Sequence, residues 1–212
     1  MILNLKSFFT PLTLVLTLVL TLVSIKMYSP FAKDFSSTRY AKWNSVKTFL
    51  SNVKENHTIL ELGCGNGKNL IGYESQSIAI DLCPELCEIT KSRGIETHCM
   101  DVLDFKSEEK FDFILCIAVI HHLKTQQERQ KLIRIILQSL KNDGKALITT
   151  WTPSKYPYGD NNITFRGHPR FYYVYPPNEF QKDFETVMSE NTNETKSLTF
   201  FNEMENDCVF IS

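Results

Sequence analysis

The sequence predicts an α/β fold built on a mixed, mostly parallel sheet of seven strands with helices on both faces. After residue 28, short apolar runs alternate with stretches of helical periodicity, which is typical of parallel strands joined by helices. The last stretch, "SLTFFNEMENDCVFIS" at 197–212, reads as a closing hairpin with its turn near residues 205–207. A terminal hairpin makes such a sheet mixed, because its strands run antiparallel.

Five apolar runs are the predicted parallel strands. The fourth, "FDFILCIAVI", is apolar almost throughout, as expected of a strand covered on both faces, and it ends at the adjacent His121 and His122. Residues 152–180 are rich in Pro, Tyr, Asn and Gly and read as an extended loop. The predicted strands cover residues 57–62, 77–81, 95–101, 111–120 and 145–151.

Helix signals fall between these strands. In one helix Pro84 occupies the first turn and Gly94 marks the exit. The clearest helix begins with a capping box formed by Thr125 and Glu128, and Gly144 is its expected stop. The predicted helices cover residues 37–52, 70–73, 84–94 and 125–144.

Composition limits the class of protein. The 212 residues are 42% hydrophobic and 22% charged, as in a single globular domain. With a formal net charge of −1, the chain can bind nucleic acid only through a local basic face or a partner. The six cysteines lack paired metal-ligand spacing, so we expect no metal site. Cys64 and Cys116 read as buried free thiols, which favours a reducing compartment.

The N-terminal segment, residues 1–27, differs from the rest. Residues 7–25 carry no charge and as a helix would span about 28 Å, just enough for a hydrocarbon core. Three interpretations are open: a membrane anchor, a cleaved signal, or an extension outside the working protein that starts at Met27. A signal lacks a convincing cleavage site. For an anchor, the excess of Lys and Arg after the tract keeps the following domain, residues 28–212, in the cytoplasm.

The stretch "ELGCGNGKNL" carries the strongest local signal for a ligand site. Glu61 ends a strand, and Gly63, Gly65 and Gly67 then form a turn in which the backbone can approach a ligand closely. Asp81 and Asp101 end the next two predicted strands. In open α/β sheets ligands bind at the carboxyl ends of the strands, where Asp81 suits ribose hydroxyls and Asp101 an adenine amine. Taken alone, the glycines also fit a plain turn.

Together these motifs resemble the class I methyltransferases, which use S-adenosylmethionine and have a Rossmann-like fold. The resemblance spans residues 37–212 and implies S-adenosylmethionine as cofactor. The cofactor-binding residues that it implies are Glu61, Gly63, Cys64, Gly65, Gly67, Asp81, Leu82, Asp101, Val102, Cys116 and Ile117.

A narrower resemblance rests on "YSPFAKDFSSTRYAKWNSVKTFL" (28–50), "IAVIHHL" (117–123) and "PRFYYVYPPNEF" (169–180). These stretches are similar to the eukaryotic wobble-uridine tRNA methyltransferases, which convert the carboxylate of 5-carboxymethyluridine to its methyl ester. The resemblance implies tRNA as substrate and a small zinc-binding activator subunit as partner. We expect a cytoplasmic location, with the nucleus left open as a second compartment. The alternative location is a membrane, through residues 7–25.

A carboxylate acceptor determines what the polar residues are expected to do. Its pKa lies near 4, so it is already an anion at pH 7 and needs no general base. We therefore expect Arg39, His121 and His122 to position the acceptor or cover the cofactor. For the histidines the alternative is that one caps the strand while the other faces solvent. Tyr40, Arg170 and Tyr172 are the candidate substrate-binding residues, with packing on the sheet as the alternative.

Two other functions remain open at the level of sequence. One is methylation of a small molecule or protein on the same fold, since a fold does not determine the acceptor. The other is a non-catalytic scaffold on a methyltransferase-like fold.

Overall fold

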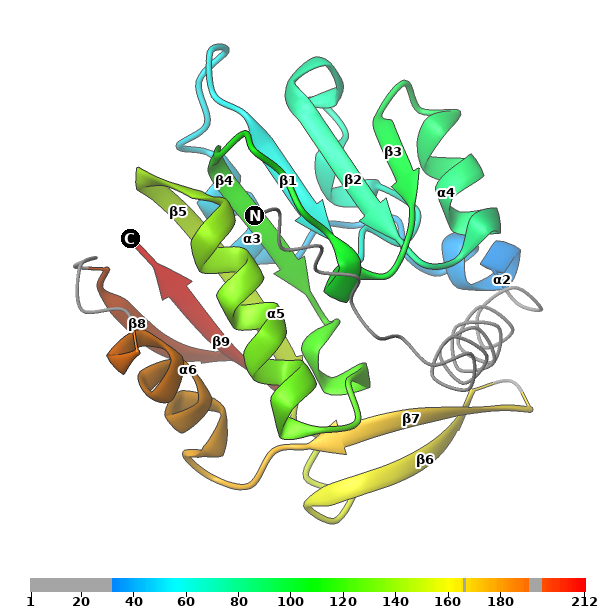
Figure 1. The fold of residues 1–212 in the computed structure, drawn as a ribbon. Coiled ribbons are helices and arrows are strands. Elements are labelled where there is room, and N and C mark those ends of the chain that lie inside the picture. Colours follow the sequence, from blue (N-terminus) through cyan, green and yellow to red (C-terminus); the bar gives the residue numbers. More distant parts are fainter. Residues whose placement is uncertain (1–31, 166, 191–195) are drawn as a thin grey trace, which may run out of the picture.

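Seven strands form one sheet in the order β3-β2-β1-β4-β5-β9-β8 in a computed structural model, which describes residues 32–165, 167–190 and 196–212 (Figure 1). The strands from β3 to β5 run parallel, whereas β9 and β8 are antiparallel to their neighbours. This confirms the predicted mixed, mostly parallel sheet. The strands are β1 Ile59–Leu62, β2 Ser77–Asp81, β3 Glu96–Cys99, β4 Phe111–Ile117, β5 Leu140–Trp151, β8 Leu198–Glu203 and β9 Asn206–Ile211.

The apolar run of the fourth strand reflects its central position. Strand β4 pairs with β1 on one side and β5 on the other. Its side chains alternate between two cores, because successive strand residues point to opposite faces. Ile114 and Cys116 pack with helices α5 (Gln126–Ser139) and α6 (Glu179–Ser189). Phe113 and Leu115 pack on the other face with α3 (Asn44–Leu50).

Two of the predicted helix starts are confirmed. Helix α4 spans Pro84–Lys91 and begins at the proline. Helix α5 begins with the predicted capping box: the Glu128 amide donates to Thr125 Oγ1 at 3.1 Å, and the Thr125 amide donates to Glu128 Oε2 at 2.9 Å.

Two helix predictions before α4 were wrong, and α4 itself ends at Lys91, before the predicted exit at Gly94. The helix expected at 37–52 is α3 alone, preceded by a short helix α2 (Ala32–Ser37). The connection between α2 and α3 is hydrogen-bonded to the glycine turn, because Asn66 Nδ2 donates to the Arg39 carbonyl at 3.0 Å. This tertiary contact overrides the helical periodicity of the sequence. The helix expected at 70–73 is replaced by two single 3₁₀ turns, at Lys68–Leu70 and Glu74–Gln76.

Gly144 does not stop helix α5. The helix ends at Ser139, and strand β5 follows at once from Leu140. A Cβ at Gly144 would lie 2.8 Å from the carbonyl oxygen of Phe111. Glycine is therefore needed here for close approach of β5 to β4, where the register of the two strands shifts.

The loop expected at 152–180 contains a hairpin and the start of α6. Strands β6 (Gly159–Phe165) and β7 (His168–Val174) form a separate two-stranded sheet, which lies below the carboxyl ends of the parallel strands in Figure 1. Alternate residues of β7, Arg170, Tyr172 and Val174, are buried. The Pro and Gly content indicated a loop, although the same segment contains two runs of β-branched and aromatic residues that favour strands.

The strand predicted at 111–120 ends early. Strand β4 stops at Ile117, three residues early, because Ala118 takes a φ of +58° and residues Ile120–His122 form a 3₁₀ turn. The closing hairpin is confirmed, with residues 204–205 between its strands.

No helix within residues 32–165, 167–190 and 196–212 is long and apolar enough to cross a membrane. The hydrophobic tract at 7–25, with its three interpretations, lies outside the described residues.

Candidate active site

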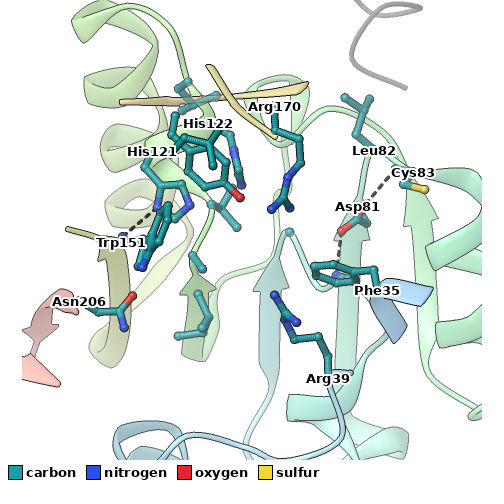
Figure 2. Close-up of a pocket in the computed structure, with 18 of the residues that line it drawn as sticks. Phe35, Arg39, Asp81, Leu82, Cys83, His121, His122, Trp151, Arg170 and Asn206 are labelled. Atoms are coloured by element: carbon teal, nitrogen blue, oxygen red, sulfur yellow. Dashed lines mark hydrogen bonds between the residues drawn. The ribbon is translucent and has the colours of Figure 1, made fainter. Parts of the chain in front are cut away.

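A cavity of about 700 Å³ opens at the carboxyl edge of the parallel sheet. Its lining includes residues that follow or end strands β1, β2, β4 and β5, namely Gly63, Asp81, Ile117 and Trp151. Strand β7 and the segment from α2 to α3 complete the wall (Figure 2). The cavity has one end at the glycine turn and another beneath the β6–β7 hairpin.

The glycine turn forms the first end. Gly63, Gly65 and Gly67 have φ values of +76°, +57° and +70°, a region that side chains disfavour. A Cβ at Gly63 would lie 2.2 Å from Val119 Cγ2, so glycine is needed here for the close approach of Val119, and Gly63 and Gly65 both line the cavity. Gly67 instead packs against Thr90 and does not line the cavity.

Asp81 and Asp101 place two carboxyl groups in the same end of the cavity. Asp81 Oδ2 accepts from the Gly65 amide at 2.7 Å, and Oδ1 accepts from the Cys83 amide at 2.9 Å (Figure 2). Burial raises the pKa of the Asp81 carboxyl to about 6, although these amides oppose the shift. Asp101 accepts from the Leu103 amide at 2.9 Å, and burial raises its pKa as well. Each carboxylate retains lone pairs that can accept from hydroxyl or amino groups of a ligand.

The two histidines lie at the second end, on the 3₁₀ turn after β4. His121 Nδ1 accepts the amide proton of Trp151 at 2.9 Å, and His122 Nδ1 lies 2.9 Å from the Phe171 carbonyl oxygen, to which it donates. Both rings pack on Tyr172, with ring centroids 5.1 Å and 4.5 Å away. The pair is thus fixed between the end of β5 and strand β7.

Both imidazoles are neutral at pH 7. Burial holds the pKa of His121 well below its usual range, and the nearby His122 and Arg170 lower it further. Burial lowers the pKa of His122 to about 4, with Arg170 contributing. Given the hydrogen bonds at Nδ1, neutral His121 carries its proton on Nε2, whereas neutral His122 has a lone pair there.

Three cationic side chains line the cavity. Arg39 reaches the cavity from the α2–α3 connection, and Arg170 reaches it from β7 (Figure 2). The Arg170 guanidinium lies 5.1 Å from the Tyr172 ring centroid, and Arg39 lies 4.8 Å from that of Phe35. Lys155 also lines the cavity, and the acids among the described lining residues are Asp81, Asp101 and Glu205. The part of the cavity beside Arg170 and the histidines is suited to an anion.

Most of the predicted site residues meet at this cavity, and five do not. Glu61 and Cys116 are buried in the sheet, and Cys64 is buried in the turn. Burial raises the pKa of Glu61 to about 8, and its Oε1 accepts from Asn69 at 2.7 Å. Gly67 packs on α4, and the Tyr40 side chain is 85% exposed. The predicted residues that line the cavity are Arg39, Gly63, Gly65, Asp81, Leu82, Asp101, Val102, Ile117, His121, His122, Arg170 and Tyr172.

Sequence reasoning missed Trp151, Tyr156 and Asn206, which also line the cavity. Trp151 ends β5, so the rule that ligands lie at the carboxyl edge could have found it. Asn206 is opposite Trp151 in the β5–β9 register. Its Nδ2 donates to the Glu203 carbonyl at 3.2 Å, and its buried Oδ1 has no partner among the described residues. No local signal distinguishes Asn206 or Tyr156. Among residues 32–165, 167–190 and 196–212, no group of His, Cys, Asp or Glu could hold a metal ion.

Comparison with known proteins decides the family. A family model described as "Methyltransferase domain" matches residues 35–190. The chain belongs to this methyltransferase family. The family and the class I fold expected from the sequence are both confirmed.

Relatives of this methyltransferase include two curated proteins named tRNA (carboxymethyluridine(34)-5-O)-methyltransferase. The protein of Arabidopsis thaliana is 38% identical over 128 residues, which are 59% of this chain and 32% of the relative. The protein of Saccharomyces cerevisiae is 36% identical over 132 residues, 59% of this chain and 47% of the relative. The matched region thus spans less than half of either relative.

A solved structure shares the fold of this methyltransferase. The DhpI-SAM-HEP complex has a TM-score of 0.67 and 14% sequence identity, covering 92% of this chain and 97% of DhpI. At this identity the likeness concerns the fold alone.

Proposed function

We propose that this methyltransferase transfers a methyl group from S-adenosylmethionine to the carboxylate of 5-carboxymethyluridine at the wobble position of tRNA. The names of the two curated relatives support this substrate. Residues 28–212 are the proposed catalytic domain, and residues 1–27 are a separate hydrophobic segment. The small zinc-binding activator subunit stays a prediction of the sequence resemblance, and the cytoplasmic location, with the nucleus open as a second compartment, stays a prediction too.

The residues at the glycine-turn end fit S-adenosylmethionine. Gly63 and Gly65 of the turn line the cavity, and Asp81 offers two oxygens already oriented by backbone amides, as ribose hydroxyls require. Asp101 provides a further acceptor for the adenine amine. When bound, S-adenosylmethionine supplies an electrophilic methyl group on a positively charged sulfur.

The observation that carries the choice of acceptor is the positive charge in the cavity. Arg39, Lys155 and Arg170 line it, Arg170 acts on both histidines, and both histidines are neutral. A carboxylate is attracted by this arrangement and needs no proton removed before it attacks a methyl group. Arg39 and Arg170 then hold the carboxylate, and His121 and His122 shape the wall that excludes water. Such positioning is worth about 7–11 kcal/mol where reacting atoms are held in line.

The proposal is tested by methyl transfer to tRNA from a strain that lacks the enzyme. The full chain is incubated with labelled S-adenosylmethionine, alone and with a co-purified activator subunit, and the nucleosides are separated by mass spectrometry. We expect label in the methyl ester of 5-carboxymethyluridine. Label in another nucleoside, or free acid that persists in both incubations, would contradict the proposal.

The Arg39→Ala variant tests the role of the cationic end. We expect kcat/KM for tRNA to fall about 10- to 150-fold, because a hydrogen bond to a charged group contributes about 1.5–3 kcal/mol. The Kd for S-adenosylmethionine by calorimetry should not change. Lys47→Ala is the matched control, because Lys47 is exposed on α3 and does not line the cavity. An equal loss of cofactor binding and transfer would argue against a substrate role for Arg39.

A further inference from the structure

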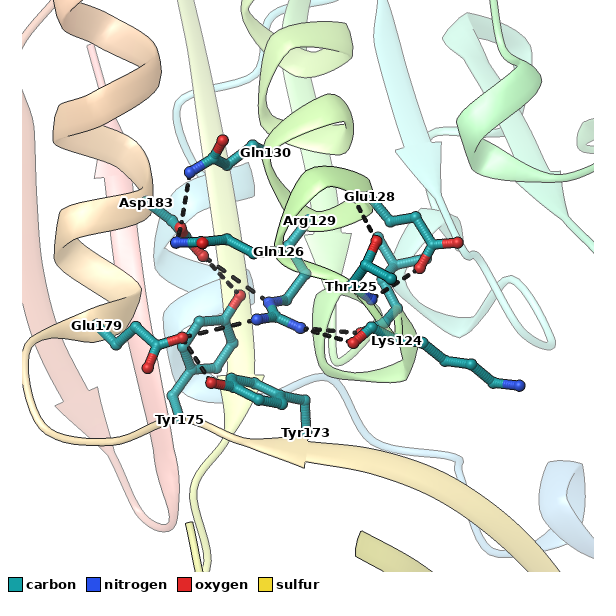
Figure 3. Close-up of polar contacts among 11 residues, drawn as sticks. Lys124, Thr125, Gln126, Glu128, Arg129, Gln130, Tyr173, Tyr175, Glu179 and Asp183 are labelled. Atoms are coloured by element: carbon teal, nitrogen blue, oxygen red, sulfur yellow. Dashed lines mark hydrogen bonds and ion pairs between the residues drawn. The ribbon is translucent and has the colours of Figure 1, made fainter. Parts of the chain in front are cut away.

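A buried arginine that lies outside the cavity contacts both of the segments that form the acceptor end of the cavity. Arg129 lies in the first turns of α5, is 2% exposed, and does not line the cavity. Figure 3 shows its guanidinium between the turn that precedes α5, strand β7 and the loop into α6. A buried cation is expensive unless it is well paired, so its contacts indicate what it holds.

The first contacts are with the histidine turn. Arg129 Nη1 donates to the carbonyl oxygens of Leu123 and Lys124 at 3.3 Å and 3.2 Å. These are the two residues that follow His122 in the chain. The guanidinium therefore fixes the exit of the turn that carries both histidines.

The second contact is with strand β7. The Arg129 guanidinium carbon lies 3.6 Å from the centroid of the Tyr173 ring. Tyr173 is next to Tyr172, and adjacent strand residues point to opposite faces. While Tyr173 packs on Arg129, Tyr172 packs on His121 and His122 on the cavity side. One guanidinium thus contacts both the backbone beyond the histidines and the back of the strand that faces them.

Two carboxylates of α6 hold the guanidinium in this orientation. Arg129 lies 3.6 Å from Glu179 Oε1 through Nη2 and 3.8 Å from Asp183 Oδ2 through Nε. Glu179 Oε1 also accepts from the Tyr173 hydroxyl at 2.6 Å. Asp183 is fully buried, and its Oδ1 accepts from Gln126 and Gln130 at 2.9 Å and 3.1 Å (Figure 3).

We propose that Arg129 is a positioning residue for the methyl acceptor. It sets the distance between the histidine turn and β7, through the Leu123 and Lys124 carbonyls and the Tyr173 ring. The inference rests on the proposed function in one respect, namely that the histidine end receives the acceptor. It does not involve the cofactor end, because the glycine turn, Asp81 and Asp101 make none of these contacts.

The test compares Arg129→Met with Arg134→Met in the full chain. Arg134 is on the same helix and also pairs with α6, through two 2.8 Å contacts with Glu190, but it is remote from the histidine turn and β7. For Arg129→Met we expect kcat to fall about 10- to 100-fold, because a misplacement of about 1 Å can cost that much. The Kd for S-adenosylmethionine should stay within twofold. Arg134→Met should retain the wild-type kcat.

A second readout does not depend on transfer. His122 donates from Nδ1 to the Phe171 carbonyl, and this buried imidazole N–H gives a slowly exchanging proton signal by nuclear magnetic resonance. We expect the signal to persist in Arg134→Met and to shift or disappear in Arg129→Met. If wild-type chain transfers no methyl group to tRNA, the proposed function fails, and the signal still decides the role of Arg129.

Two results would overturn the proposal. One is an unchanged His122 signal and kcat in Arg129→Met. The other is a loss of cofactor affinity in parallel with kcat, which indicates a general loss of structure. Should Arg129→Met not fold, Arg129→Lys replaces it: the ammonium retains the charge but cannot contact two carbonyls and a ring face together. Arg129→Lys with wild-type kcat and His122 signal would equally refute the proposal.

Discussion

Burial has opposite effects on the acids and the histidines of the cavity, and both effects suit the proposed chemistry. It raises the pKa of Asp81 and lowers those of His121 and His122, because a low-dielectric surrounding disfavours the charged form of either group. At neutral pH the cavity therefore holds an anionic acid at one end and neutral imidazoles beside Arg170 at the other. The Arg170 cation attracts an anionic acceptor to that end.

The raised pKa of Asp81 predicts a pH dependence of cofactor binding. The free carboxyl has a pKa of about 6, and only its ionised form accepts hydrogen bonds from two ribose hydroxyls through both oxygens. Affinity should thus be constant above pH 7 and weaken as pH falls through 6, by about tenfold per unit below it. Calorimetry with S-adenosylmethionine from pH 8 to 5 measures this. Asp81→Asn should bind weakly without this dependence, and a pH-independent Kd in the wild type would contradict the assignment.

At the scale of elements, the strand ends and the turns between them form the site. The sequence predicts some of these elements better than others. The Thr125–Glu128 capping box is a local motif, and it forms as the sequence predicts. The β6–β7 hairpin depends on burial of Arg170, Tyr172 and Val174 beneath the carboxyl edge, which a local reading of Pro and Gly cannot reveal. Local signals succeed where the contact partners are close in sequence, and fail where tertiary contacts decide.

Two glycine substitutions in the segment after β1 are expected to destabilise the fold by different amounts. Gly63→Ala places a side chain at φ +76° and 2.2 Å from Val119 Cγ2, so Val119 must move in the cavity wall. Gly72 has a φ of +88°, but a Cβ added there would enter open space. We expect the free energy of unfolding in urea to fall by about 2–4 kcal/mol for Gly63→Ala and about 1 kcal/mol for Gly72→Ala. Cofactor binding should weaken in Gly63→Ala alone; equal effects of both variants would contradict the close approach.

At the scale of the whole molecule, the topology explains which site residues the sequence can predict. Asp81 ends β2 and Asp101 follows β3, and a parallel sheet brings such ends to one edge, so both were predictable without a structure. Glu61 and Cys116 belong to strands too, but they lie within the buried sheet rather than past its edge. Asn206 lines the cavity from β9, an antiparallel strand between β5 and β8, a placement that only the full strand order determines.

The charge of the whole molecule predicts how transfer depends on salt. With a formal net charge of −1 the chain has no overall attraction for tRNA, and the cations lining the cavity are Arg39, Lys155 and Arg170. Each neutralised phosphate contributes about 0.7 to 0.9 to the slope of log affinity against log salt, so three cations give a slope no steeper than about −2 to −3, and a shallower one where Arg39 and Arg170 contact the acceptor carboxylate instead. Affinity for tRNA should fall by no more than about 60-fold between 50 and 200 mM salt, measured by filter binding, while the Kd for S-adenosylmethionine stays within twofold. A slope steeper than about −6 would require a broad basic surface, which would contradict recognition through the cavity rim.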